Sequence, residues 1–413
     1  MTTICLNMIV KNEANIIAET LANVLAHIRI DYWVICDTGS SDDTMNIVQS
    51  FFDQRGIAGQ LLQHPWKNFG QNRQWALEAA EGKTDYVLFF DADDRIEGQL
   101  TLPEPLSATF YNLFLTNSQR NTRYPRRLLA KNDGSVFWQG VLHEIIMPKP
   151  NTAAQELHIE GPYHVVSGRF GARNQDPDKY LKDAKLLEEA FEQETDLMLK
   201  KRYSYYCGQS YRDANLPDLA AAWYEKNIAL CPAKGEEVRF SYVALGNEYN
   251  RLNNHSKAAE AWWAAYEALP QNNESLALLA QMYYNTQKHQ LGFEVAKKAS
   301  HIPMPSGKDT LFVNEPIHRY MVRYELARNA IKLNLWDEAY VACRDLLNEA
   351  EFSEALNEFV LEVLSLQKNQ IEQDTLLNAK HIHQRLRQLQ QLSEKSQHLR
   401  NQLLVWFQSQ FAV

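Results

Sequence analysis

The sequence predicts an α/β domain with a mostly parallel, mixed sheet over residues 1–170, followed by an all-α helical solenoid over residues 201–350. Short apolar runs typical of buried strands alternate with amphipathic helical patterns at the start of the chain, which favours a parallel sheet covered on both faces. From Tyr180 onward strand patterns are almost absent, and small and aromatic residues recur at a regular interval. Residues 171–200 are expected to form a linker and a connecting helix, and residues 351–413 to form C-terminal helices.

Composition and charge narrow the class of protein. The chain has 413 residues, of which 45% are hydrophobic and 23% charged, as in ordinary globular proteins. The formal net charge of −9 argues against a dedicated nucleic-acid-binding protein, which would usually present a basic face. The 5 cysteines are scattered without a Cys-x-x-Cys pair, which favours reduced thiols over disulfides or a zinc site. With no signal-peptide pattern and no apolar run long enough to cross a membrane, we expect a cytoplasmic protein.

Strand and helix patterns alternate in the first part of the chain. Strands are expected over residues 4–10, 32–36, 61–62 and 86–90. Helices are expected over residues 16–28, 44–52 and 69–80, with Gly82 closing the last. After Pro105 the pattern changes to strands over residues 109–116, 126–130 and 136–138, which we expect to form a mixed sheet lining an acceptor pocket.

Polar clusters follow three of these strands, over residues 11–13, 37–42 and 91–94. In a doubly wound sheet the carboxyl ends of the strands converge along one rim, where ligands bind. Carboxylates gathered there are unfavourable unless a positive group meets them, and a hard divalent cation carrying a phosphate-bearing substrate would do so. A simpler alternative for the Asp91 cluster is a turn with an acidic helix cap, and Asp42 is itself interpreted as a helix cap.

Taken together, four segments resemble the nucleotide-binding half of family 2 glycosyltransferases in their order and spacing. They are Met8 to Glu13, Asp37 to Thr44, Asn72-Arg73 and Asp91 to Asp94. The resemblance covers residues 1 to about 170 and implies a GT-A (Rossmann-like) fold, a nucleotide-sugar donor such as a UDP-sugar, and a divalent cation, Mn²⁺ or Mg²⁺. The family usually has Arg-Asn where this chain has Asn72-Arg73.

The resemblance implies roles for individual side chains by matching position. Asp37 would accept a hydrogen bond from the nucleotide base, with Lys11 and Glu13 nearby. Asp91 would face the ribose, and Asp93 would hold the metal on the diphosphate. The alternative for Asp37 is a turn residue whose carboxylate bonds its own backbone.

Transfer chemistry also needs a base that removes the acceptor proton while the donor bond opens through an oxocarbenium-like sugar. Glu144 is the candidate base and His143 would orient the substrate or diphosphate, because this His-Glu pair resembles that of lipopolysaccharide-core and peptide glycosyltransferases. The alternative is a Glu–Lys pair beside a packed histidine. Arg73 is a candidate for the donor phosphates or sugar, or else a surface salt-bridge partner. His164 matches the place where GT-A enzymes often supply a third metal ligand, although a lone histidine is more often simply hydrogen-bonded.

The repeat in the second half resembles the tetratricopeptide unit, in which small residues stand where two helices cross and aromatic residues fill the gap. The first copy contains Gly208, Tyr211, Ala220, Tyr224 and Pro232, and the next contains Gly246, Tyr249, Ala258, Trp262 and Pro270. A third copy contains Ala280, Tyr283, Gly292 and Ala296, and a weaker fourth contains Ala327, Ala339 and Cys343. An apolar stripe near the C-terminus is expected to cap the open end of the solenoid or to form a dimer seam.

These expectations combine into a metal-dependent, inverting glycosyltransferase that moves a sugar from a UDP-sugar to a peptide, protein or saccharide acceptor. Helical repeats offer surfaces for extended peptides, so they would hold the acceptor or merely stiffen or dimerise the enzyme. A second hypothesis, of a different class, is a non-catalytic scaffold in which a decayed sugar-nucleotide domain presents the repeats. The sequence leaves the sugar and the acceptor open.

Overall fold

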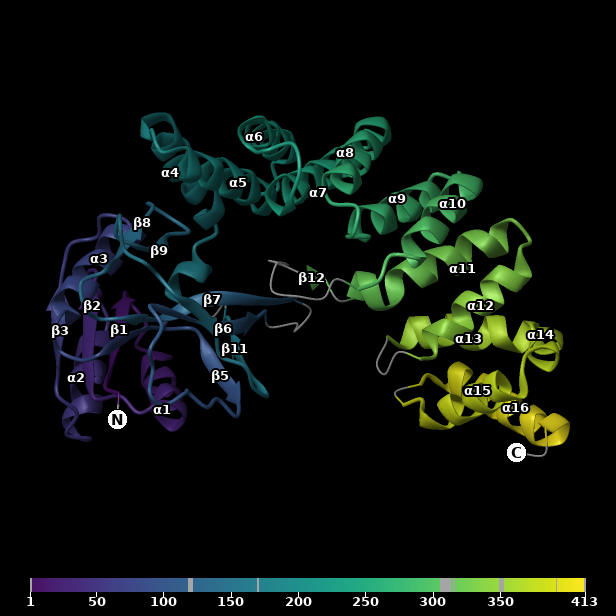
Figure 1. Ribbon diagram of the computed structural model, residues 1–413, viewed down its shortest axis with the longest axis horizontal. Coiled ribbons are helices and arrows are strands. Elements are labelled where there is room, and N and C mark those ends of the chain that lie inside the picture. Colours follow the sequence, from purple (N-terminus) through teal and green to yellow (C-terminus); the bar gives the residue numbers. More distant parts are fainter. Residues whose placement is uncertain are drawn as a thin grey trace. The chain divides into compact units, whose positions relative to one another are not determined.

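The computed structural model describes residues 2–117, 122–168, 171–304, 313–314, 316–348, 353–390 and 392–411. The chain divides into two compact units, Met1–Cys231 with Leu311–Val313, and Pro232–Thr310 with Asn314–Val413. The first unit contains the α/β domain and the helices that follow it, and the second is almost entirely helical (Figure 1). The first helices of the repeat region therefore belong to the same compact unit as the sheet, whereas the sequence suggested a change of domain within residues 171–200.

The strands of the first unit are β1 (Ile4–Val10), β2 (Tyr32–Asp37), β3 (Gly59–Gln63), β4 (Tyr86–Phe89), β5 (Arg95–Gly98), β6 (Phe110–Thr116), β7 (Thr122–Lys131), β8 (Val136–Gln139), β9 (Ile145–Pro148), β10 (Glu156–His158) and β11 (Tyr163–Val166). Its helices are α1 (Ile17–His27), α2 (Thr44–Asp53), α3 (Phe69–Ala80), the short η1 (Ala172–Gln175), α4 (Lys179–Gln193), α5 (Leu197–Asp213) and α6 (Pro217–Leu230).

The main sheet has the order β3-β2-β1-β4-β7-β6-β11-β5, with β10 added to β6. Strand β1 pairs in parallel with β2 and β4, and β2 pairs in parallel with β3. Strand β7 is antiparallel to both β4 and β6, so the sheet is mixed beyond β4, as expected. Strands β5, β9, β10 and β11 were not expected from the sequence, whereas β4 and β8, which are as short, were expected.

Alternate residues of the parallel strands face two separate cores. Leu6 and Met8 of β1 pack in one core with residues of α1 and α2, such as Val24 and Phe52. The other face carries residues such as Phe89, which packs against residues of α3 and of the antiparallel β8–β9 hairpin. Continuous apolar runs are required here because both faces of the strands are covered.

The elements of the second unit are α7 (Glu236–Arg251), α8 (His255–Ala268), α9 (Glu274–Asn285), α10 (His289–Ser300), η2 (Ile317–Met321), α11 (Val322–Lys332), α12 (Trp336–Leu346), α13 (Glu354–Leu366), α14 (Lys368–Gln373), α15 (Leu376–Gln388) and α16 (Glu394–Phe411), and the short strand β12 (Val313–Asn314) precedes η2.

Helix crossings explain the repeated small residues. A Cβ added at Gly208 of α5 would lie 2.7 Å from the ring of Tyr224 in α6, and one added at Gly246 of α7 would lie 2.5 Å from the ring of Trp262 in α8. In both pairs the glycine lets an aromatic ring of the partner helix approach the backbone closely. This is the packing that the tetratricopeptide pattern predicts.

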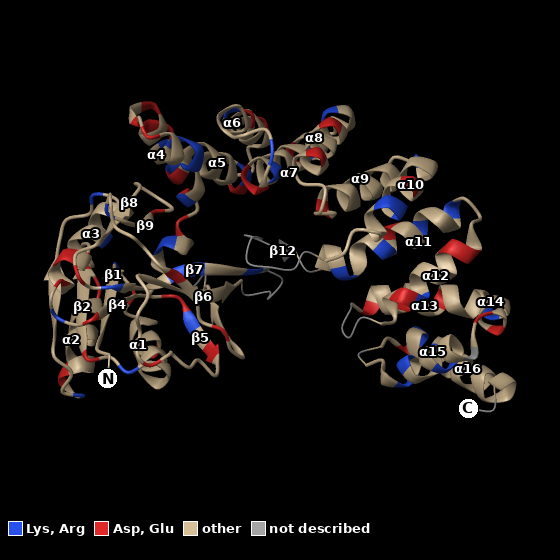
Figure 2. Cartoon of the chain, viewed as in Figure 1, with Lys and Arg blue, Asp and Glu red and all other residues tan. Residues whose placement is uncertain are grey.

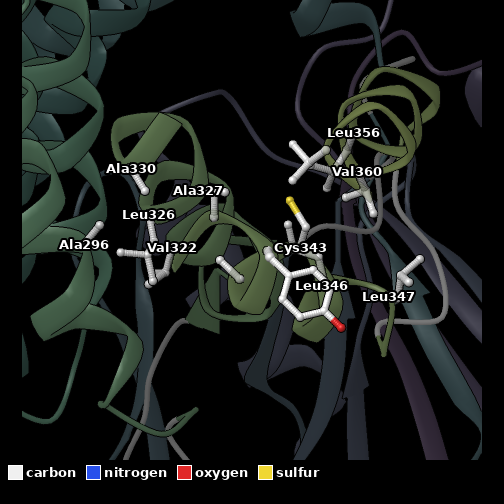
Figure 3. Close-up of a cluster of buried hydrophobic side chains, with 14 of the residues drawn as sticks. Ala296, Val322, Leu326, Ala327, Ala330, Cys343, Leu346, Leu347, Leu356 and Val360 are labelled. Carbon is white, nitrogen blue, oxygen red and sulfur yellow. The ribbon is translucent and has the colours of Figure 1, made fainter. Parts of the chain in front are cut away.

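The core of the second unit continues into the C-terminal helices. Figure 3 shows part of it, where Ala327 of α11, Cys343 and Leu346 of α12, and Val360 of α13 gather in one buried cluster. Leu403 and Phe407 of α16 are buried in the same core.

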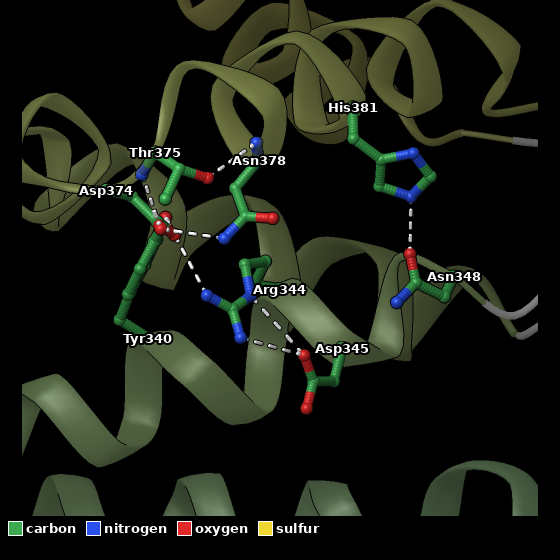
Figure 4. Close-up of polar contacts among 8 residues, drawn as sticks. All are labelled: Tyr340, Arg344, Asp345, Asn348, Asp374, Thr375, Asn378 and His381. Carbon is green, nitrogen blue, oxygen red and sulfur yellow. Dashed lines mark hydrogen bonds and ion pairs between the residues drawn. The ribbon is translucent and has the colours of Figure 1, made fainter.

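A polar network joins α12 to the segment before α15 (Figure 4). The Asp374 carboxylate accepts hydrogen bonds from Tyr340 Oη and Arg344 Nη1, each at 2.9 Å, and from Asn378 Nδ2 at 2.7 Å. These contacts outweigh burial and lower the pKa of Asp374 to about 2. His381 of α15 contacts Asn348 and is not paired with His383, in line with the two-residue spacing.

Two sequence expectations concern disulfides and membranes. All five cysteines are free thiols, as expected: Cys5, Cys36, Cys207, Cys231 and Cys343. Among the described residues, no helix combines the length and apolar character needed to cross a membrane.

Candidate active site

The turns after β1 and β2 bind each other directly. Asn12 accepts a hydrogen bond at its Oδ1 from the Ser41 amide at 2.7 Å, and the Asn12 amide donates to Ser40 Oγ at 2.8 Å. The Glu13 amide donates to Thr44 Oγ1 at 2.8 Å, while Lys11 is exposed on the same turn. The strand ends therefore converge along one rim, as the alternating pattern predicted.

Asp37, at the end of β2, is 2% exposed and uses only one of its carboxylate oxygens. Oδ1 accepts hydrogen bonds from the amides of Gly39 and Ser40, both at 2.9 Å, so Asp37 does shape the turn. Oδ2 is buried and has no hydrogen-bond partner within the chain. A buried, unpaired carboxylate oxygen is unfavourable, so this atom is available to accept a hydrogen bond from a ligand.

Asp42 serves the start of α2, as interpreted from the sequence. Its Oδ1 accepts hydrogen bonds from the Thr44 amide at 3.1 Å and from Thr44 Oγ1 at 2.5 Å, and its Oδ2 accepts one from the Ala14 amide at 3.1 Å. These bonds more than offset a small desolvation effect and lower the pKa of Asp42. The carboxylate thereby satisfies amides at the helix terminus and in the adjacent turn.

Glu13 and Asp93 approach each other across Gly171. A Cβ added at Gly171 would lie 3.2 Å from Asp93 Oδ2 and 3.2 Å from Glu13 Oε1. Asp93 Oδ2 accepts a hydrogen bond from Asn174 Nδ2 at 3.3 Å. Burial raises the pKa of Glu13 to about 7, with the Ala172 amide opposing the shift and the charges of Asp93 and Asp42 adding to it. Burial, together with the Asp91 charge, also raises the pKa of Asp93. The two carboxylates thus form a pair that a cation would stabilise.

Figure 2 colours the acidic residues of the chain red. Asp94 is a further acidic residue of the segment after β4, and its side chain is buried, at 3% exposed. Burial and the nearby Asp91 raise its pKa to about 8, against the opposing effect of Arg126. Its side chain is therefore a neutral carboxylic acid at pH 7. Asp94 contributes to the local structure rather than to the negative charge of the rim.

Arg73 of α3 joins two of the predicted site residues. Its Nη2 is ion-paired with Asp91 Oδ1, and its Nε donates to Glu144 Oε1 at 2.5 Å. Arg126 of β7 binds the other Asp91 oxygen at 3.0 Å. Although burial alone would raise the pKa of Asp91, Arg73 and Arg126 hold it below its usual range. Since the Arg73 side chain is only 6% exposed, the alternative of a surface salt-bridge partner is wrong.

Asp91 and Arg73 meet each other in this arrangement. Both oxygens of Asp91 are bound by arginines, and Arg73 binds the carboxylates of Asp91 and Glu144. The expected contacts of Asp91 with ribose and of Arg73 with the donor stay predictions. The sequence did not single out Arg126, although an arginine within an apolar strand pattern was a usable signal.

His143 and Glu144 lie in the loop of residues 140–144, between β8 and β9. The Glu144 side chain is 7% exposed and faces Arg73, whereas His143 faces solvent and stacks on Tyr206 of α5, with ring centroids 3.8 Å apart. Packing of its ring against neighbouring atoms, followed by the charges of Arg202 and Arg173, lowers the pKa of His143. The imidazole is therefore neutral at pH 7.

The structure does not bring His164 to Asp93. His164 is exposed on β11, where its backbone pairs with Glu97 of β5. After β11 the chain approaches Asp93 at Gly168, where an added Cβ would lie 1.9 Å from the Asp93 carbonyl oxygen. Four residues of extended chain span about 13 Å, so His164 does not join Asp93 as the expected third metal ligand. Within the described part of the chain, no group of three or more His, Cys, Asp or Glu residues is arranged to hold a metal by itself.

Comparison with known proteins matches the first part of the chain to a family of glycosyltransferases. Residues 5–106 match the model of the family described as Glycosyl transferase family 2. The chain is also 30% identical over 133 residues to the lipopolysaccharide core biosynthesis glycosyltransferase LpsC of Rhizobium meliloti (strain 1021). That match covers 29% of this chain and 48% of LpsC, so the chain spans about half the length of this curated relative.

Solved structures with related folds match the chain more loosely. MamA matches with a TM-score of 0.32 and 16% identity, over 41% of this chain and 85% of MamA. The C-terminal part of a TPR repeat-containing protein from Cytophaga hutchinsonii matches with a TM-score of 0.37 and 13% identity, over 50% of this chain and 73% of that protein. TarS of S. aureus matches with a TM-score of 0.35 and 14% identity, over 63% of this chain and 55% of TarS. Residues 5–106 of the N-terminal α/β domain thus match glycosyltransferase family 2, and helix pairs packed in the manner of tetratricopeptide units follow that domain.

Proposed function

We propose that the chain transfers a sugar from a nucleotide sugar, with a UDP-sugar as the donor, to a hydroxyl-bearing acceptor with the help of a divalent cation. The observation that carries the proposal is the approach of Glu13 and Asp93 across Gly171 at the carboxyl end of the parallel strands. Two acidic groups with raised pKa values at a ligand-binding rim are typical of a site completed by a cation.

The residues present fit Mn²⁺ or Mg²⁺. Carboxylate oxygens are the ligands these cations prefer, and Mg²⁺ commonly binds one or two protein carboxylates and completes its sphere with phosphate oxygens and water. Asp93 would hold the cation, with Glu13 beside it. When bound, the cation would neutralise the diphosphate that leaves the donor. Asp37 Oδ2, which lacks a partner, would accept a hydrogen bond from the nucleotide base.

Glu144 would be the base that takes the acceptor proton, in a single displacement that inverts the anomeric carbon. Arg73 would keep Glu144 correctly oriented, since it already donates to Glu144 Oε1 at 2.5 Å. His143, neutral and exposed beside Glu144, would orient the acceptor or the diphosphate.

A cavity of about 100 Å³ beside His143 is the proposed place for the acceptor. Its lining includes Asp183, Gln209 and Asp213 from α4 and α5, whose oxygens and amide suit the hydroxyl groups of a saccharide. The match to a lipopolysaccharide core glycosyltransferase supports a saccharide acceptor, while the helix pairs support a peptide or protein acceptor.

Calorimetric titration of the full chain with UDP, with and without Mn²⁺, tests the proposal. The wild-type protein should bind UDP more tightly with Mn²⁺, and a panel of UDP-sugars should reveal one that it hydrolyses. Asp93→Asn should lose the Mn²⁺-dependent part of binding and all hydrolysis with little change in melting temperature. Asp53→Asn, an exposed carboxylate at the end of α2, is the control and should behave as wild type.

Two results would contradict the proposal. If the wild-type protein bound no nucleoside diphosphate with Mn²⁺, the scaffold hypothesis would replace it. If nuclear magnetic resonance showed retained anomeric configuration in the product, single displacement would be wrong.

A further inference from the structure

The 140–144 loop has a backbone that needs external support. Gly140 has a φ of 104°, and His143 has a φ of 51°, which places a non-glycine residue in the left-handed region. That conformation costs about 1–2 kcal/mol for an L-residue with a Cβ. Such conformations persist only where the surrounding structure holds them in place. The contacts that hold this loop therefore decide where Glu144 points.

Helix α3 supports the loop on one side. The Phe69 amide donates to the Val141 carbonyl oxygen at 3.1 Å. A Cβ added at Gly70 would lie 2.0 Å from the Gly140 carbonyl oxygen, so the loop backbone rests directly on the start of α3. These contacts come from the same helix that carries Arg73, which lies within the residues that match the family model.

Three residues of α5 contact the loop. The Val141 amide donates to Tyr203 Oη at 3.2 Å. Arg202 Nε donates to the His143 carbonyl oxygen. The His143 ring lies parallel to Tyr206, with ring centroids 3.8 Å apart and an interplanar angle of 9°. Arg202 and Tyr206 both contact His143, the residue with the left-handed backbone.

Helix α5 is itself rigidly placed as the first helix of the repeat region. Its start is capped by Asp196, which accepts from the Leu199 amide at 3.0 Å. Gly208 lets Tyr224 of α6 pack against its backbone, and Tyr203 is 2% exposed. A helix fixed at its start and along its length can serve as a rigid support for a strained loop.

We propose that α5 is an integral part of the transferase active site, in which Arg202, Tyr203 and Tyr206 are positioning residues for the 140–144 loop. They hold His143 in its left-handed conformation and thereby direct Glu144 toward Arg73. The inference rests on the proposed function in assigning the base role to Glu144. This inference gives α5, the first helix of the repeat region, a role that is separate from binding an acceptor. It also means that residues 5–106, which match the family model, do not contain the complete site.

Hydrogen–deuterium exchange on the full chain tests the support of the loop without requiring activity. Tyr203→Phe removes the hydroxyl that accepts from the Val141 amide, and exchange of that amide should become about tenfold faster. Tyr211→Phe is the matched control, because Tyr211 lies on the same helix and its hydroxyl donates to Glu188 instead, at 2.8 Å. It should leave exchange of Val141 unchanged. Equal exchange in Tyr203→Phe and wild type would overturn the proposal.

Activity then separates positioning from general destabilisation. Tyr206→Leu removes the ring beneath His143 and should lower kcat for donor hydrolysis at least tenfold while the Kd for UDP with Mn²⁺ stays unchanged. Tyr206→Phe keeps the ring and should restore most of kcat. An unchanged kcat in Tyr206→Leu would contradict the proposal. Absence of nucleotide binding in the wild-type chain would instead count against the proposed function, and the exchange result would still decide whether α5 holds the loop.

Discussion

Arg73 donates through Nε to Glu144 Oε1 at 2.5 Å. This contact joins α3, which lies within the residues 5–106 that match the family model, to the 140–144 loop, which lies outside them. The same guanidinium is ion-paired with Asp91. The buried Arg73 side chain therefore fixes Glu144, the proposed base, relative to Asp91 in the segment after β4. The fixed fork of donors on a planar guanidinium sets the directions of both contacts, which the single ammonium of a lysine does not do.

Replacing Arg73 should destabilise the first unit. Arg73→Met leaves the Glu144 carboxylate buried at 7% exposure without its ion partner, so we expect a loss of about 3–5 kcal/mol in the free energy of unfolding. Urea unfolding followed by tryptophan fluorescence measures the change. Arg95→Met removes an exposed ion pair with Glu19 and should change stability by at most about 1 kcal/mol. Similar values for the two variants would show that the Arg73 network does not support the fold.

Replacing Asp37 should weaken nucleotide binding without disturbing the turn. In Asp37→Asn the retained Oδ1 can still accept from the amides of Gly39 and Ser40, but the buried Oδ2 becomes an amide donor. The Kd for UDP with Mn²⁺ should rise about tenfold or more, because a base N–H would then meet another donor. Titration calorimetry measures Kd, with Asp53→Asn as the reference. An unchanged Kd would leave Asp37 with only its turn-forming role.

The second unit should lose stability as the pH rises through 7. Burial raises the pKa of Glu325 to about 7, although Arg328 opposes the shift, whereas the unfolded chain should titrate near its ordinary 4.5. Between these values the folded state holds a proton that the unfolded state has released, so stability falls as the pH rises. This contribution is fully present below about pH 4.5 and is lost above about pH 7.

Melting temperatures at pH 5 and pH 8 check the pH prediction. Glu325→Gln cannot ionise, so its melting temperature should fall less between the two pH values than that of the wild type. Glu372→Gln, at an exposed position of α14, should follow the wild type. A decline in Glu325→Gln as large as that in the wild type would assign the effect to another group.

Adding one methyl group at a helix crossing should destabilise the repeat region. Gly246→Ala places a Cβ 2.5 Å from Trp262 Nε1, which forces α7 and α8 apart or moves the ring, at a cost of about 1–3 kcal/mol. Trp262→Phe, as a second change, should recover part of that loss, because a smaller ring leaves room for the methyl group. A double-mutant cycle in urea, with Trp262→Phe alone as the control, measures the coupling. Purely additive losses would mean that the two residues do not determine the crossing.

Much of the fold could be read from the sequence. The strands at residues 4–10 and 32–36, and the helices at 16–28 and 69–80, match β1, β2, α1 and α3 closely, because buried strands and amphipathic helices leave long local patterns. The tetratricopeptide pattern likewise named Gly246 and Trp262, which meet in the structure. Of the strands of three or four residues, β4 and β8 were expected, and β5, β9, β10 and β11 were not.

The site could be read only in part. Glu13, Asp37 and Asp93 were chosen from strand ends, and the structure places all three at one rim, with Glu13 beside Asp93. Arg126 and Tyr206 were missed because they act through partners distant in the sequence, Asp91 and His143. His164 was expected near Asp93, but β11 carries it away to pair with Glu97.

What the sequence determined by itself is the class of each half of the chain and the kinds of residue at its strand ends, since periodicity and composition are local properties. Only the tertiary structure decided that Arg73 binds both Asp91 and Glu144, and that α5 packs against the 140–144 loop. Those contacts depend on how separate helices and strands come together, and the free energy of a buried ion pair or a stacked ring belongs to both partners at once. No local pattern around either partner contains that information.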